Sequence, residues 1–565
     1  MEKKNAVMKK VGIGLVIVII AFSGYFVVDK LLKEDIISTN KTGYIAGSVA
    51  KVSLYDMEFN KVIDVVRGSK VVVKKDEFVN ESDNTKYIKI EHDKKDYLIR
   101  INSLVYNVED VVLEDKLYVR TPLTIYKDES SSSILSMAKK GTELEIIGYD
   151  KIDEEGLVNR YKVVTGDFTG FVYGKYLVST KDEALKNYDE EGTYKIHSSR
   201  GNTQGGGAAS NLDFYPYKKP AFENNVMPSE VRSLYLNTGV IGNVDAYISL
   251  AKNSNINAFV VDIKDNTSPG YPALAMKELS PTNYKKANNS YNKYKQAIQK
   301  LLDEGFYVIG RITVFKDSYY VQDHPEAAIM DNDTGLPFKH NGSHWPTAFS
   351  RDVWEFNIEL AKESVKEMGF HEIQFDYVRF PDRTYQLEKA GKMDMRNIYN
   401  EDKAQAIQGF LMYACDEIHQ LGAYVSADVF GESAHNYVTG YGQYWAAISN
   451  VVDVISAMPY PDHFSAYEYG FSDIVWTVPY DLLYFWGNNY AAKRQTEIPT
   501  PAKVRTWIQA YNAIRSPYIE YDHEKVSDQI RGLYDAGLTG GYMTWNAGSS
   551  LEKYKSLAPA FKKEY

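Results

Sequence analysis

The stretch Ile373-Gln-Phe-Asp376-Tyr-Val-Arg379-Phe-Pro381 decides the fold expected for this chain. Its first residues form a short apolar strand, and a carboxylate follows directly after them. The segment before it, 353–368, has the pattern of an amphipathic helix and is followed by Gly369, the residue type that commonly ends a helix. A helix followed by a short buried strand predicts one unit of a parallel α/β domain.

Seven further strands alternate with helix-like segments between residue 231 and the C-terminus. The eight expected strands are Ser233–Leu236, Ala258–Ile263, Tyr307–Val314, Glu372–Tyr377, Ala423–Val429, Val454–Met458, Thr506–Ala510 and Gly541–Thr544. Eight such units predict an α/β fold, a (β/α)8 TIM barrel over residues 231–565. A doubly wound open sheet is the alternative, but no strand carries its Gly-x-Gly-x-x-Gly turn.

Acidic side chains stand where these strands end. In a TIM barrel, the reacting groups lie at the carboxyl ends of the strands and in the loops that follow. That rule selects five acids: Asp262, Asp376, Asp428, Glu432 and Asp462. A functional site is therefore expected at this end of the barrel.

Side chains alternate along a strand, and this decides which residues share the barrel interior. The alternation places three pairs on shared faces: Asp262 with Lys264, Gln374 with Asp376, and Ser426 with Asp428. If these faces point inward, carboxylates from the second, fourth and fifth strands converge. Neighbouring strands lie ~4.8 Å apart, so these carboxylates can approach the spacing of a glycosidase pair, roughly 5–9.5 Å.

Glycoside hydrolysis uses two carboxyl groups in different environments. One stays ionised as nucleophile or base, and the other has a raised pKa so that it can protonate the leaving oxygen. We expect Arg311 and Arg379 to hold Asp376 ionised. Structural ion pairing across the barrel top is the alternative interpretation of each acid.

Two further residues are assigned from the same argument. Lys264 is expected to hold Asp262 ionised, because the two share a strand face. Glu432 follows Gly431 on a loop and is expected to reach over the site as the acid. Asp428 remains a second candidate for that role.

Five segments together resemble one bacterial family. They are Asp262-Ile-Lys264-Asp265, Gly310-Arg311-Ile-Thr-Val-Phe315, Ile373–Pro381, Ser426-Ala-Asp-Val-Phe-Gly431 and Met458-Pro-Tyr-Pro461. Over residues of about 230–560, the chain resembles the bacterial family labelled "putative glycosyl hydrolase", whose TIM barrels are distantly similar to the α-amylase and α-galactosidase groups. The resemblance implies a sugar-cleaving barrel.

The resemblance also implies a role for one residue. In the better-known groups the nucleophile is an aspartate at the end of the fourth strand, which corresponds to Asp376. The α-amylase pattern has an arginine two residues earlier and a glutamate acid after the fifth strand. Here Gln374 occupies the first position and Arg379 follows instead, so Asp428 and Glu432 both remain candidates for the acid.

Substrate-binding groups are expected around the same strand ends. Tyrosine and tryptophan can stack on sugar rings, and Asp462 and His463 can contact sugar hydroxyls. The complete expected set is Asp262, Lys264, Arg311, Tyr377, Arg379, Tyr460, Asp462, His463 and Trp545.

No metal or other cofactor is expected. His340 and His344 are four residues apart, which suits a metal only if they lie on a helix. Gly342 between them and Pro346 after them favour a loop.

The first thirty residues carry a membrane signal. Lysines at positions 3, 4, 9 and 10 precede an uncharged apolar run, Val11–Val28, which Asp29 and Lys30 close. The run is long enough to cross a bilayer, and the lysines keep the N-terminus in the cytoplasm. A cleaved signal peptide is the alternative, although no small-residue cleavage site is obvious. We expect residues 1–30 to be a single-pass anchor in the cell membrane, with the bulk of the chain extracytoplasmic.

Residues 31–180 are expected to be β-structure. Short apolar or alternating runs separated by charged turns are typical of small antiparallel barrels. A weak internal repeat relates 87–105 to 161–178. Residues 111–180, with Lys140-Gly-Thr-Glu-Leu-Glu-Ile-Ile-Gly148, resemble the bacterial Src-homology-3-like domains found beside cell-wall enzymes. The resemblance extends less clearly to 31–110, and both are expected to be binding or spacer domains.

Residues 181–230 are expected to be a linker that is flexible or lies along the surface, because the polar stretch Gly201-Asn-Thr-Gln-Gly-Gly-Gly-Ala-Ala-Ser210 offers nothing to bury. The net charge of −10 argues against a nucleic-acid partner. The single Cys415 excludes an intrachain disulfide.

The expected function is that of a glycoside hydrolase acting on a cell-surface or environmental polysaccharide or a cell-wall glycan. A barrel that binds carbohydrate without cleaving it is the second interpretation, but a decayed site would have lost carboxylates that this chain keeps. A deacetylase-like hydrolase would need a metal site. A serine hydrolase is disfavoured, because the chain has no Gly-x-Ser-x-Gly elbow.

Overall fold

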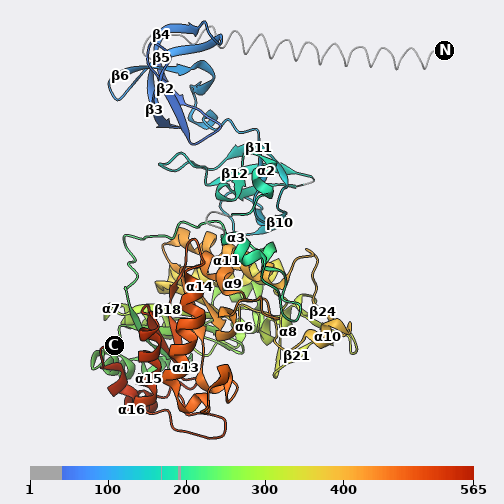
Figure 1. Ribbon diagram of the computed structural model, residues 1–565, viewed down its shortest axis with the longest axis vertical. Coiled ribbons are helices and arrows are strands. Elements are labelled where there is room, and N and C mark those ends of the chain that lie inside the picture. The colour runs from blue at the N-terminus through green and yellow to red at the C-terminus, as the bar shows by residue number, and fades with distance from the viewer. Residues whose placement is uncertain (1–40, 167, 189–192) are drawn as a thin grey trace, which may run out of the picture. The chain divides into compact units, whose positions relative to one another are not determined.

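The structure is a computed structural model that describes residues 41–166, 168–188 and 193–565. These residues divide into two compact units, one built around antiparallel sheets and the other around a parallel barrel. Figure 1 colours the antiparallel part blue to teal and the barrel green to red. The expected span Val11–Val28 lies outside the described residues, and within them no helix is long and apolar enough to cross a membrane.

Two antiparallel sheets form the N-terminal part. The first contains β1 (Lys41–Ile45), β2 (Lys51–Tyr55), β3 (Lys61–Val66), β4 (Lys70–Asn80), β5 (Thr85–His92), β6 (Lys95–Arg100) and β7 (Leu104–Val105). The second contains β8 (Lys116–Val119), β9 (Leu123–Tyr126), β10 (Ile134–Ala138), β11 (Glu143–Tyr149), β12 (Arg160–Thr165), β13 (Phe168–Tyr173) and β14 (Leu177–Val178). Strand alternation builds each core; in β2, for example, Val52 and Leu54 are buried while their neighbours are not.

The internal repeat expected from the sequence is confirmed by the strand order. The first sheet has the order β3-β2-β6-β5-β4-β1-β7, and the second has β10-β9-β13-β12-β11-β8-β14. Each strand of the second sheet stands where its counterpart stands in the first. The more specific Src-homology-3-like assignment stays a prediction.

Eight parallel strands form the barrel. They are β15 (Val231–Leu236), β16 (Ala258–Asp265), β18 (Tyr307–Thr313), β23 (Glu372–Asp376), β25 (Tyr424–Phe430), β26 (Val454–Met458), the interrupted strand β27 (Lys503–Val504) and β28 (Thr506–Gln509), and β29 (Gly541–Trp545). Their order is β27-β26-β25-β23-β18-β16-β15-β29-β28. Only Arg505 separates β27 from β28, so the two ends of this order are halves of one strand and the sheet closes. The expected (β/α)8 barrel is confirmed.

Helices connect successive strands and cover the outside of the barrel (Figure 1). The main ones are α4 (Val244–Lys252), α7 (Tyr291–Asp303), α9 (Arg351–Met368), α11 (Lys403–Ile418), α12 (Trp445–Val451), α13 (Pro479–Trp486), α15 (His523–Asp535) and α16 (Leu551–Phe561). Their ends follow local rules. Gly369 terminates α9 with a φ of 82°, and Asp402 and Gln405 form a capping box at the start of α11.

The barrel interior contains two charged layers, and the layer between them combines apolar side chains with the buried Gln374, which donates to Ser456 and Met543. The lower layer lies near the starts of the strands and consists of Tyr307, Glu372 and Arg505, with a guanidinium–carboxylate distance of 2.8 Å. The upper layer lies near the strand ends and consists of Asp262, Arg311, Asp376 and Asp428. Inward-facing Val260, Ile309 and Met543 belong to the core cluster between them.

Residues 193–230 differ from the flexible linker expected there. They contain α3 (Thr193–Ser198), and His197 and Phe214 are buried, with stacked rings 4.4 Å apart. His197 also hydrogen-bonds Tyr444 at 2.7 Å. The backbone of Asp213 exchanges two hydrogen bonds with the side chain of Gln408 on α11. This segment is therefore packed against the barrel, and we call it the strap.

The glycine run of the strap explains why composition misled the prediction. A Cβ at Gly206 would lie 1.8 Å from the carbonyl oxygen of Thr439, so only glycine permits this approach. The next residue, Gly207, has a φ of 116°. Beyond it, Ala208 and Asn211 donate hydrogen bonds to the carboxylate of Asp402. Close backbone packing replaces the apolar side chains that the stretch lacks.

Candidate active site

Arg311 is the centre of the upper layer. It lies on β18 and is fully buried, so its charge needs partners. Its Nη1 donates to Oδ1 of Asp262 at 2.7 Å, and its Nη2 donates to Oδ2 of Asp376 at 2.6 Å. Its Nε also contacts Asp376 and lies 4.0 Å from Oδ2 of Asp428. The guanidinium of Arg311 thus interacts with carboxyl groups from three strands.

Asp376 is the last residue of β23 and lies at the barrel mouth. Its Oδ2 accepts the two bonds from Arg311, and its Oδ1 accepts a hydrogen bond from the backbone N–H of Tyr377 at 2.6 Å. Tyr377 has a φ of 51°, a left-handed turn that ends the strand directly after the carboxylate. About 9% of the Asp376 side chain is exposed, whereas Asp428 has none. These contacts fix the orientation of the carboxyl group and leave an edge that substrate can reach.

Asp428 lies on β25 in a different environment. Its Oδ1 accepts a hydrogen bond from Nε1 of Trp507 at 2.8 Å, while its Oδ2 has no hydrogen-bond partner in the described part of the chain. Burial, followed by the charge of Asp376, raises the pKa of Asp428 well above its ordinary value. Asp428 can therefore hold a proton beside the arginine-bound carboxyl group of Asp376.

Asp262 is fully paired. Oδ2 accepts from the hydroxyl of Tyr235 at 2.5 Å, and Oδ1 accepts from Arg311. Burial raises the pKa of Asp262 to about 6, against the opposing effect of Arg311. With both oxygens occupied, Asp262 is better suited to orient Arg311 than to exchange protons with substrate.

The expectation that Lys264 holds Asp262 is wrong. Lys264 is fully buried and donates instead to Asp317 at 2.7 Å and to the carbonyl of Thr313. The reason is an irregularity in β16: Asp262 pairs with Arg311, but Lys264 pairs with the very next residue, Ile312. This β-bulge inserts one residue and moves Lys264 off the face that Asp262 occupies.

Arg379 does not reach Asp376 as expected. Its Nη1 donates to the carbonyl of Phe380 at 2.9 Å and to Asp382 at 3.2 Å, and its guanidinium lies 4.4 Å from the ring centroid of Phe430. Within the described residues, no ion pair joins it to Asp376. The left-handed turn at Tyr377 interrupts the strand, so alternation no longer predicts where Arg379 points.

Glu432 lies outside the upper layer. It belongs to the short helix η9 (Gly431–Ala434) and is exposed. Its carboxylate accepts hydrogen bonds from the hydroxyls of Tyr437 at 3.2 Å and Tyr441 at 2.8 Å. No ion pair connects it to Arg311 among the residues described, so it is a rim residue in this structure.

The expected aromatic residues lie in two places, the rim of the barrel mouth and the barrel core. Trp545 is half-buried, with its ring centroid 5.3 Å from the guanidinium of Arg311, and Tyr377 is also half-buried. Tyr460, in contrast, is only 4% exposed and packs in the barrel core with Trp507. Trp545 and Tyr377 can therefore present a ring face, whereas Tyr460 supports the layer from within.

Asp462 and His463 fix a loop rather than join the upper layer. Asp462 is fully buried and accepts hydrogen bonds from the hydroxyl of Tyr511 at 2.8 Å and the backbone N–H of Ile514. The side chain of His463 is exposed and lies 3.4 Å from the same hydroxyl. Asp462 thus holds the segment after β28 against the loop after β26.

Sequence reasoning missed Tyr235 and Trp507, which complete the upper layer. Both are buried aromatic residues in strands and are indistinguishable from core residues by pattern. Tyr235 stands one residue before the end of β15, as Asp262 stands near the end of β16, and this position was the available signal. Trp507 carried no such signal, because β28 continues two residues beyond it.

No metal site emerges from the residues described, where no group of three or more His, Cys, Asp or Glu side chains is arranged to hold an ion. His340 and His344 lie on two short strands, β21 (Lys339–His340) and β22 (Ser343–His344). His340 faces Asp382 at 3.3 Å, and His344 contacts a backbone carbonyl.

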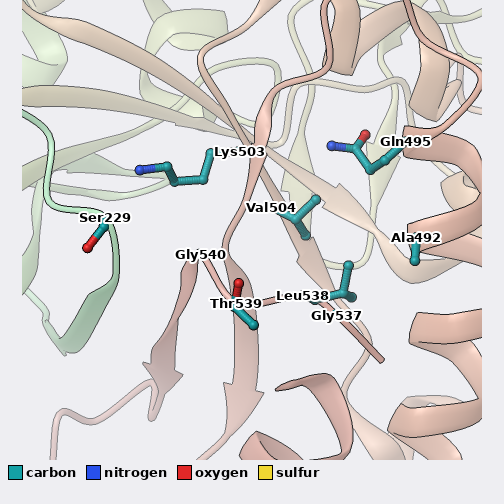
Figure 2. A pocket seen from close by; sticks show the side chains of 9 residues that line it. All are labelled: Ser229, Ala492, Gln495, Lys503, Val504, Gly537, Leu538, Thr539 and Gly540. Atoms are coloured by element: carbon teal, nitrogen blue, oxygen red, sulfur yellow. The ribbon is translucent and has the colours of Figure 1, made fainter. Parts of the chain in front are cut away.

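A separate cavity of about 360 Å³ lies at the opposite end of the barrel (Figure 2). Its lining includes the residues at or just before the starts of β15, β27 and β29, namely Ser229, Lys503, Val504 and Gly540. Its polar groups are already used: Lys503 donates to the carbonyl of Pro228, and Gln495 bonds Ala502 and Trp445. The carboxylates of the upper layer do not line it.

Comparison with known proteins identifies the family. Residues 233–551, more than half of the chain, match the family described as "Putative glycosyl hydrolase domain". No curated protein matches the sequence. Among solved structures, a hypothetical protein from Ruminiclostridium thermocellum is 33% identical, with 35% of this chain and 97% of that chain covered and a TM-score of 0.29.

Two further solved structures are also similar. The glycoside hydrolase domain of PgaB (BpsB) from Bordetella bronchiseptica is 13% identical, with 60% of this chain and 100% of that chain covered and a TM-score of 0.44. The spore cortex-lytic enzyme SleL of Bacillus megaterium is 11% identical, with 59% and 74% covered and a TM-score of 0.35. From the match over residues 233–551, the chain belongs to the "putative glycosyl hydrolase" family, and its barrel is a glycoside hydrolase domain.

Proposed function

We propose that this protein is a membrane-anchored, extracytoplasmic glycoside hydrolase that cleaves a cell-surface or environmental polysaccharide with Asp376 and Asp428. The observation that carries the proposal is the sharing of Arg311. Asp376 takes its direct hydrogen bonds, while Asp428, 4.0 Å from the same guanidinium, is buried and has a raised pKa. Two carboxyl groups in one site thus have different environments, as this chemistry needs.

The roles follow from these environments. Asp428 donates its proton to the glycosidic oxygen as the C–O bond breaks, and Asp376 either attacks the anomeric carbon or activates the water that does so. Because both carboxylates lie within 4.0 Å of one nitrogen, their separation is compatible with either a retaining pair (about 5–5.5 Å) or an inverting pair (about 6.5–9.5 Å). Trp545 and Tyr377 at the rim are suited to stack on the sugar rings.

Glu432 is the second candidate for the acid. It is exposed near the mouth, and its bonds from Tyr437 and Tyr441 hold it in place. Burial, then the charge of Glu432, raises the pKa of Tyr441 well above its ordinary value, so this hydroxyl stays protonated and donates. The geometry favours Asp428, because both carboxyl oxygens of Glu432 already accept hydrogen bonds from tyrosine hydroxyls.

The location rests on sequence. The lysine-flanked apolar run Val11–Val28 supports a single-pass anchor with the remainder of the chain outside the cytoplasm. The repeated β domains between residues 41 and 178 are suited to spacing the barrel from the membrane or to binding a cell-wall glycan.

A barrel that binds glycan without cleaving it is the second candidate function. The small exposed area of Asp376 and the complete burial of Asp428 favour it, because an acid must contact the bond that it protonates.

The test is release of reducing ends from a panel of bacterial surface and plant polysaccharides by the purified protein. Wild type is compared with Asp376→Asn, Asp428→Asn and Glu432→Gln. The proposal expects reducing ends from wild type, none from the first two variants, and substantial release from the third. Loss of activity in Glu432→Gln alone would transfer the acid role to Glu432. Binding of one glycan by every protein, without cleavage by any, would establish the binding function instead.

A further inference from the structure

The indole of Trp507 distinguishes the two oxygens of Asp428. Trp507 Nε1 carries a hydrogen and can only donate, so Oδ1 of Asp428 must accept. A proton on the neutral carboxyl group therefore cannot lie between these two atoms. It must be on Oδ2.

Oδ2 is also the oxygen of Asp428 that approaches Arg311. It lies 4.0 Å from Nε of Arg311, and that nitrogen already donates to Asp376 at 3.2 Å. Among the described residues nothing hydrogen-bonds Oδ2, although it is buried. A buried carboxyl oxygen without a protein partner is costly unless a ligand oxygen completes it.

Trp507 is itself held rigidly. It is 1% exposed on β28, and its ring packs edge-to-face on Trp545 at 5.6 Å and on Tyr235 at 6.1 Å. The indole therefore cannot rotate away from Asp428 without disturbing both neighbours. This fixes the carboxyl plane as well as the accepting oxygen.

We propose that Trp507 is a positioning residue that directs the acidic proton of Asp428 onto Oδ2, toward the glycosidic oxygen of a bound sugar. The proposal rests on the proposed function, since it presumes that Asp428 is the acid. In the reaction, the proton leaves Oδ2 as the C–O bond breaks. The resulting carboxylate is stabilised by the indole N–H on Oδ1 and by Arg311 near Oδ2.

The test is the pH dependence of kcat/KM in Trp507→Phe. Phenylalanine keeps an aromatic ring but removes the N–H that stabilises ionised Asp428. The pKa of Asp428 should rise, so the alkaline limb of the profile should move upward by about one pH unit. At the optimum, kcat should fall about tenfold, because the acid is weaker and its plane is less fixed.

Trp445→Phe is the matched control. Trp445 is also fully buried and its Nε1 donates to a side chain, Gln495, at 2.8 Å. It should lose similar stability while the alkaline limb stays in place. An unshifted limb in Trp507→Phe, or an equal shift in both variants, would overturn the role of Trp507.

Asp428→Asn separates this inference from the function on which it rests. If Asp428→Asn is inactive but Trp507→Phe has the wild-type profile, only the role of Trp507 fails. If Asp428→Asn keeps wild-type activity, the assignment of the acid fails and takes this inference with it.

Discussion

The two charged layers of the barrel contain the same chemical groups in different ratios. In the lower layer one carboxylate, Glu372, meets one guanidinium, Arg505, at 2.8 Å, and Tyr307 donates to the same carboxylate. In the upper layer one guanidinium is shared by Asp262 and Asp376, with Asp428 at 4.0 Å. Among the residues that the structure describes, guanidinium nitrogens of Arg505 in the lower layer have no partner, and in the upper layer a carboxyl oxygen of Asp428 has none.

This difference separates a structural ion pair from a reactive one. A one-to-one pair is balanced in charge, so neither group has to retain a proton. A shared guanidinium cannot compensate every carboxylate, so protons must be retained, and burial raises the pKa values of Asp262 and Asp428. Proton transfer is therefore expected in the upper layer and rigidity in the lower one.

The largest expected effect is on catalysis. Asp376→Asn should lower kcat/KM by about 10⁴-fold, because the amide removes the charge without changing the shape. Glu372→Gln, the same kind of change in the lower layer, should leave kcat/KM of the folded protein within about threefold. Steady-state assays on a cleaved glycan measure both. Equal losses in the two variants would contradict the division between the layers.

The second expected effect is on stability, and here the variant in the lower layer should show the larger change. Glu372→Gln leaves the buried charge of Arg505 uncompensated and should reduce the free energy of unfolding by roughly 3–5 kcal/mol. Asp376→Asn should reduce it by less than about 1 kcal/mol, because Arg311 keeps Asp262 as a partner. Denaturant unfolding of both variants measures the difference. A destabilisation by Asp376→Asn as large as that by Glu372→Gln would show that the upper layer, too, is built for stability.

The smallest effect is the pH dependence contributed by Asp262. Its pKa is raised to about 6 in the folded protein from an ordinary value of 3.8, so the folded state holds the proton more tightly. Its stabilising contribution is complete below about pH 4 and is lost as the pH rises to about 6. Relative to Asp262→Asn, wild type should lose up to about 3 kcal/mol across that interval.

Unfolding free energies at several pH values between 4 and 7 test this prediction. The difference between the two proteins should be constant above pH 7. A difference that does not change with pH would show that Asp262 is ionised throughout.

Most of the fold and three acids of the site could be predicted, because the strands that carry them are regular. The eight strands were expected, and the alternation correctly placed Asp262, Asp376 and Asp428 toward one another. This worked because a period of two relates sequence to direction as long as the strand stays regular.

The failures occur where that regularity ends. The bulge after Asp262 moves Lys264 to Asp317, and the left-handed turn at Tyr377 redirects Arg379. Neither irregularity has a clear sequence signal. Trp507 was missed because a buried strand tryptophan resembles a core residue until its N–H partner is known.

The strap determines where the protein chain can be truncated without loss of contacts to the barrel. The family match begins at residue 233 and the first barrel strand at residue 231, which invites a cut just before them. A chain cut there would lose the hydrogen bond between His197 and Tyr444 and the one between Asp213 and Gln408. It would also lose the two groups that donate hydrogen bonds to Asp402 at the start of α11. A piece that keeps these contacts therefore starts no later than Leu185, and the compact unit that includes the barrel also contains residues 121–138. For this family member, the border of sequence similarity and the border of the folding unit are different places.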